Sequence, residues 1–143
     1  MEGFMHVKKM VVLSALALAL LPHSKPAVAG NVSGAALACY VDTNAYDQPK
    51  VGVCRSVWTP STASNPSIAY FTVVGLTTGN YSFVWKDLET NGNPGCTGSV
   101  CIVPISTDVS GDGLAKLQVT ITDLDNNAQK IVSATARYLD GWH

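Results

Sequence analysis

The chain has 143 residues, 13% of them charged, and a formal net charge of −1 at pH 7. Its nine Lys and Arg residues form no long basic run, which argues against the concentrated basic surface that nucleic-acid binding requires. The length corresponds to one domain, and 47% hydrophobic residues are enough for a packed core.

The first 29 residues have the pattern of a signal peptide. A Lys-Lys pair precedes an apolar run over residues 10–21, and Ala-Val-Ala at 27–29 fits a signal peptidase site. The run is shorter than the roughly 20 residues that cross a bilayer as a helix. We therefore expect residues 1–29 to be cleaved. Residues 30–143 are then a secreted or periplasmic domain without a membrane segment.

The mature chain shows about seven segments typical of β-strands. In the longer ones apolar and polar residues alternate, and Tyr81, Phe83 and Trp85 share one face. Clusters of Gly, Asn and Asp separate the segments, and no window shows a sustained helical period. The pattern predicts an all-β fold, a single antiparallel sandwich. The expected strands cover residues 36–41, 51–58, 67–76, 80–88, 100–105, 114–123 and 129–139.

Two stretches resemble a known family. AYFTVVGLTTGNYSFVWKD (69–87) and LQVTITDLDNNAQKIVSATARY (117–138) are similar to immunoglobulin-like modules of bacterial exported proteins, particularly PKD-type domains. The shared features are an aromatic-x-Trp strand and a closing V-x-I-T-D hairpin. Lys-Asp-Leu follows the tryptophan where that family has a Gly-Asp-Gly turn, and the cysteines are additional. The resemblance implies an Ig-like sandwich that binds, spaces or stabilises, and it implies no catalytic residues.

Four cysteines remain after cleavage: Cys39, Cys54, Cys96 and Cys101. An even number in an exported chain indicates two disulfides. The gaps of 14, 41 and 4 residues fit neither the C-x2-C pairs of zinc sites nor a C-x-x-C redox couple. Of the three connectivities, we favour Cys39–Cys54 with Cys96–Cys101. A bond between distant strands, such as Cys54–Cys101, is the alternative.

Candidate binding residues lie beside loops. Trp58 borders a loop and Trp142 the C-terminus, where a ring can stack on a sugar or anchor a protein. The alternative is that both rings cover the edge of the sandwich. Thr97 and Ser99 lie inside the small ring that a Cys96–Cys101 bond would close. A rigid ring lowers the entropic cost of binding.

No metal site is favoured, and no cofactor is expected. Asp123, Asp125 and Asn127 supply the oxygen ligands that calcium prefers, but such residues also form hairpin turns without any ion. His143, the one histidine of the mature chain, is its last residue, and chain ends fray. A catalytic base must be held precisely, so we expect no enzyme.

These features favour a non-catalytic interaction module that binds a protein or a glycan through loops or an edge strand. The alternative is a structural subunit of an extracellular fibre or surface assembly, forming a homo-oligomer through strand edges. A free, uncharged terminal strand would favour that alternative, and the segment KIVSATARYL (130–139), close to the C-terminus, is compatible with it. A small secreted hydrolase or enzyme inhibitor is a third, less favoured hypothesis.

Overall fold

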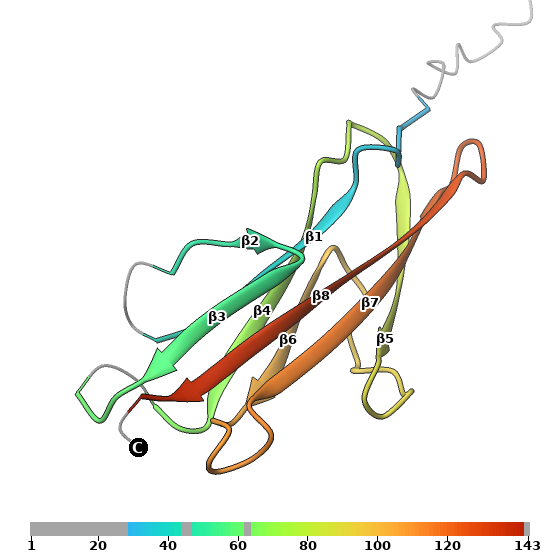
Figure 1. Cartoon of the computed structure of the whole chain (residues 1–143). Helices are drawn as coiled ribbons and strands as arrows, with labels where there is room; N and C mark the ends of the chain where they lie inside the picture. The colour runs from blue at the N-terminus through green and yellow to red at the C-terminus, as the bar shows by residue number, and fades with distance from the viewer. Residues whose placement is uncertain (1–28, 44–46, 62–63, 142–143) are drawn as a thin grey trace, which may run out of the picture.

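The computed structural model describes residues 29–43, 47–61 and 64–141. Trp142, His143 and all but the last residue of the expected signal peptide lie outside them. The described residues form two packed β-sheets (Figure 1). No helix among them is long and apolar enough to cross a membrane. The strands are β1 (Ala36–Val41), β2 (Lys50–Val51), β3 (Val53–Trp58), β4 (Ser67–Val74), β5 (Tyr81–Asp87), β6 (Val100–Ile105), β7 (Leu114–Asp123) and β8 (Gln129–Asp140).

One sheet, called sheet A, has the order β2-β1-β4-β6, and sheet B has the order β3-β8-β7-β5. The all-β sandwich is confirmed, with eight strands in place of about seven. Every pair is antiparallel except β3–β8, which is parallel. The extra strand arises because the segment 51–58 divides at Gly52, which has a φ of 79°. This left-handed conformation favours glycine, and at this point the chain passes from sheet A to sheet B.

The last strand is not a free edge. β8 pairs with β7 along one side and with β3 along the other (Figure 1). Among the described residues, the last strand is therefore not the free terminal strand that would favour fibre assembly. The edge strands are β2 and β6 in sheet A and β3 and β5 in sheet B. Pro104 in β6 lacks a backbone N–H, a feature that protects exposed edges from pairing.

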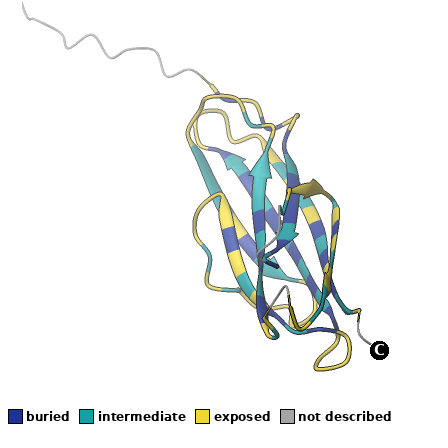
Figure 2. Ribbon diagram, turned by 90° about the vertical axis from the view of Figure 1, so that its left-hand side faces the viewer, coloured by how far each residue is buried: buried dark blue, intermediate teal, exposed yellow. Residues whose placement is uncertain are grey.

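The core lies between the sheets and follows the alternation seen in the sequence. Buried and more exposed bands succeed one another along the strands (Figure 2). Trp85 is only 2% exposed, and Phe71 from sheet A and Val119 from sheet B are fully buried. The inward positions of β7 and β8 carry mainly small and branched residues, together with the large side chain of Tyr138, and these fill the space between the two sheets. Alternation therefore predicted the buried face correctly.

Both disulfides join cysteines that are neighbours in sequence, so the favoured connectivity is confirmed. Cys39–Cys54 links β1 of sheet A to β3 of sheet B and is buried at both ends. Cys96–Cys101 closes the loop that precedes β6. No free cysteine is present among the described residues.

Candidate binding surface

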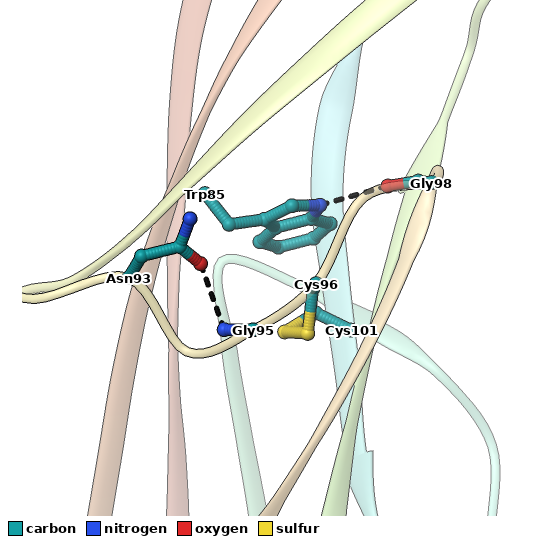
Figure 3. The surroundings of a disulfide bond; sticks show 6 residues. All are labelled: Trp85, Asn93, Gly95, Cys96, Gly98 and Cys101. Atoms are coloured by element: carbon teal, nitrogen blue, oxygen red, sulfur yellow. Dashed lines mark hydrogen bonds between the residues drawn. A yellow bond between two sulfur atoms is a disulfide. The ribbon is translucent and has the colours of Figure 1, made fainter.

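The loop closed by Cys96 and Cys101 covers the central tryptophan of the core. The indole Nε1 of Trp85 donates a hydrogen bond of 2.7 Å to the carbonyl oxygen of Gly98, inside the ring (Figure 3). Before the ring, the side-chain oxygen of Asn93 accepts a bond of 2.7 Å from the backbone N–H of Gly95 (Figure 3). The Cys96–Cys101 disulfide therefore holds the Gly98 carbonyl, which is the hydrogen-bond partner of the buried indole N–H. This is a structural role.

The two ring residues predicted as binding candidates, Thr97 and Ser99, are both exposed. The carbonyl oxygen of Ser99 accepts a hydrogen bond of 2.9 Å from the backbone N–H of Val73, which extends the pairing of β4 with β6. The disulfide-closed ring therefore continues the edge of sheet A. The role of Thr97 and Ser99 in binding stays a prediction.

Trp58 ends β3 and is half-buried, with its side chain packed against the core. Its carbonyl oxygen accepts a bond of 3.0 Å from the N–H of Gly141, so the chain end returns to this strand. This position matches the alternative in which the indole ring of Trp58 covers the edge of the sandwich. Whether it also binds a partner stays a prediction.

The three calcium candidates belong to the turn between β7 and β8. Asp123 is fully buried, and its Oδ1 accepts a bond of 2.9 Å from the backbone N–H of Asp125. Its Oδ2 has no hydrogen-bond partner. Asn127 has a φ of 60° and donates its N–H to the carbonyl of Asp123. These bonds build a turn, and the described residues contain no group of three acidic, His or Cys side chains suited to a metal.

The outer face of sheet A carries an apolar surface that the sequence analysis did not identify. Tyr40, Tyr70 and Ile102 stand in register across β1, β4 and β6. Val100 and Ile102 are each 47% exposed, far above what a core position shows. We call this surface the tyrosine face, and its members are Tyr40, Ile68, Tyr70, Val100, Ile102 and Pro104.

The two tyrosines at its centre are ordered against each other. Their rings are stacked, with centroids 4.6 Å apart and an angle of 8° between the planes. Burial raises the pKa of Tyr40, and Tyr70, Asp42 and Asp47 raise it further. The stacking contact therefore limits the side-chain freedom of both rings.

Polar side chains border the tyrosine face beside Tyr40. A hollow of about 300 Å³ opens there, and Asp47, Gln48, Lys50 and Arg55 contribute to its lining. Asp47 is fixed because its carboxylate accepts bonds of 2.8 and 2.9 Å from the N–H and Oγ1 of Thr43. The apolar centre thus has a charged rim on this side.

A sequence signal for this surface existed. Along 67–76, apolar or aromatic residues occur on both faces of the strand, and the same holds for 100–105. In a two-layer sandwich only one face of such a strand enters the core, so the other must be exposed. Which side chains meet on it depends on register, which these two segments alone do not fix.

None of the protein-family models, curated proteins or solved structures compared with this chain matches it. Its two disulfides indicate an oxidising, extracytoplasmic compartment.

Proposed function

We propose that this protein is a non-catalytic interaction module of the extracellular or periplasmic space, and that it binds a protein partner through the tyrosine face. The observation that carries the proposal is the row Tyr40–Tyr70–Ile102, which presents aromatic and aliphatic side chains on the solvent side of a sheet. Contiguous apolar surface of this kind, bordered by polar residues, marks protein interfaces.

The composition of the surface supports a protein as the partner. Interface centres are depleted in charge and enriched in tyrosine, and their rims are polar. No member of the tyrosine face is charged, whereas Lys50 and Asp47 lie beside it. Fixed rings lose little freedom on binding, which favours affinity.

The proposal includes an Ig-like topology. β1 belongs to one sheet, and β3, shortly after it, pairs in parallel with the last strand in the other sheet. Trp85 fills the core from β5, the edge strand at the other side of sheet B. A central buried tryptophan between two such sheets is typical of Ig-like sandwiches, which support this kind of binding role.

The experiment uses two exposed isoleucines on opposite faces. Ile102 lies on the tyrosine face and Ile131 on the outer face of sheet B, with exposures of 47% and 61%. A photo-crosslinking amino acid is placed at one position or the other in the full chain, expressed in its native host. The proposal predicts a discrete protein adduct from position 102 and none from position 131.

Each other outcome changes the conclusion. Equal adducts from both positions, or none from position 102, would overturn the proposal. An adduct between two copies of the chain would instead support the structural-subunit alternative. Mass spectrometry of the adduct distinguishes a foreign protein from a second copy.

A further inference from the structure

The outer face of sheet B differs from the tyrosine face, because its charges are all positive. Arg55, Arg137, Lys116 and Lys86 occupy outward positions on β3, β8, β7 and β5 respectively. No outward position on these four strands carries Asp or Glu. Four of the six basic residues of the mature chain therefore gather on one face of an acidic protein.

The register aligns these cations in a diagonal line across the whole sheet. Arg55 pairs directly with Arg137. Lys116 pairs with Thr135, two residues from Arg137 along β8. Lys86 pairs with Gln118, two residues from Lys116 along β7. Since adjacent strands lie about 4.8 Å apart, the line spans at least about 14 Å. We call it the cationic stripe.

The stripe is not neutralised within the described part of the chain. Its one ion pair joins Lys116 Nζ to Glu89 Oε1 at 3.4 Å, and both side chains are partly exposed. Exposed pairs of this kind contribute little and exchange readily. Arg55 and Arg137 stand side by side, and like charges at paired positions repel. A bound anion would relieve that repulsion.

We propose that the cationic stripe binds a linear acidic polysaccharide. Charge complementarity is the reason, since a chain of regularly spaced carboxylates or sulfates can contact all four cations in turn. Thr135 pairs with Lys116, Gln118 pairs with Lys86, and Ser133 pairs with Gln118, so these side chains lie beside the stripe and supply hydrogen-bonding groups for sugar hydroxyls. Acidic residues such as Asp108, Asp112 and Asp125 lie in loops at the ends of the sandwich, where they repel a polyanion and confine it to the face.

The stripe and the tyrosine face lie on the outer faces of different sheets and approach each other at Arg55, which also lines the hollow beside Tyr40. The variants that test each proposal leave Arg55 unchanged, so the two proposals can fail independently. Together they would let one module bridge an acidic glycan and a protein. Four cations on a flat sheet are few for nucleic acid, whose affinity grows with the number of phosphates contacted. We therefore favour the polysaccharide, and the experiment tests nucleic-acid binding as the competing result.

The test measures the affinity of the mature protein for polygalacturonate and dextran sulfate, with neutral dextran and a single-stranded oligonucleotide as further arms. The matched variants are Lys86→Gln, on the stripe, and Lys130→Gln, on β8 away from it. Both remove one lysine charge. Circular dichroism melts confirm that each variant is folded.

We expect binding to both acidic polysaccharides, none to neutral dextran, and weakening with added salt. The stripe variant should bind about tenfold more weakly than the control variant. Equal losses in the two variants, or no binding to either acidic polysaccharide, would overturn the proposal. Tighter binding to the oligonucleotide would assign the stripe to nucleic acid instead.

Discussion

Trp85 and Gly98 are joined by a hydrogen bond of 2.7 Å from the indole nitrogen to the backbone carbonyl oxygen. The bond connects the largest buried side chain of sheet B to the disulfide-closed loop before β6 of sheet A. It makes the small covalent ring part of the core, because a buried indole N–H needs a partner.

Replacing Trp85 by Phe should therefore destabilise the fold by about 2–4 kcal/mol, from the lost hydrogen bond and the void left behind. The measurement is urea unfolding with both disulfides intact. Val84→Ala on the same strand is the control, since Val84 is 62% exposed and should change stability by less than about 0.5 kcal/mol. Equal effects of the two substitutions would contradict the account.

The two disulfides should contribute unequally. The Cys39–Cys54 bond spans 15 residues and the Cys96–Cys101 bond spans 5. Loop entropy gives about 3 and about 2 kcal/mol respectively. Both Cys39 and Cys54 are buried, whereas in the second pair Cys101 is buried and Cys96 is only partly so. Replacing Cys39 and Cys54 by Ala should therefore add the larger packing loss to the larger loop term. Urea unfolding of the two double-alanine variants tests the order, and a larger loss from the Cys96–Cys101 pair would be the opposite of this expectation.

Stability should fall in strong base because of Tyr138. Its side chain is fully buried, and its hydroxyl donates a bond of 2.6 Å to the carbonyl of Ser64. Burial raises the pKa of Tyr138 above its ordinary value, and the carboxylates of Asp42 and Asp47 raise it further. The folded state therefore holds the proton more tightly than the unfolded chain.

The resulting stability is complete below the unfolded pKa of about 10 and is lost as pH rises through the higher folded pKa. We expect the free energy of unfolding to decline above about pH 10. The decline in the free energy of unfolding should be shallower in Tyr138→Phe. We assign the decline that remains in this variant to Tyr40, whose pKa is also raised. Identical pH profiles for the variant and the parent would refute the assignment to Tyr138.

Calcium should not shift the melting temperature. Asp123 Oδ1 is engaged by the N–H of Asp125, and the side-chain oxygen of Asn126 accepts from Ala128 at 2.8 Å. These two oxygens shape the turn. Asp123 Oδ2 has no hydrogen-bond partner among the described residues, but it is buried, and calcium takes about six to eight oxygen ligands. Melting in millimolar calcium and in EDTA is the measurement, because a ligand of the native state must raise the midpoint. A midpoint several degrees higher in calcium would restore the metal interpretation.

Most of the fold could be predicted from the sequence because each strand has its own local signal. Alternation placed Trp85 and Val119 in the core, and the cysteine spacing favoured the pairs that form. The break at Gly52 was missed, because a strand divides there only to serve two different sheets. The partners in each sheet depend on long-range packing.

The candidate surface was missed for a related reason. Tyr40 and Tyr70 lie 30 positions apart in the chain and meet only because β1 pairs with β4 in this register. Strands with apolar residues on both faces indicate that some apolar surface stays exposed. They do not indicate which side chains gather on it. The cationic stripe depends in the same way on the pairing of β3 with β8.

The central claim is that the tyrosine face is the contact surface. Its most direct test is the affinity of the crosslinked partner, once purified, for the parent protein, for Ile102→Glu and for Ile131→Glu, measured by calorimetry. Each variant adds one negative charge at an exposed isoleucine. The account predicts a loss of at least about tenfold, or about 1.4 kcal/mol, for Ile102→Glu and an unchanged affinity for Ile131→Glu. Equal affinities of the two variants would contradict it.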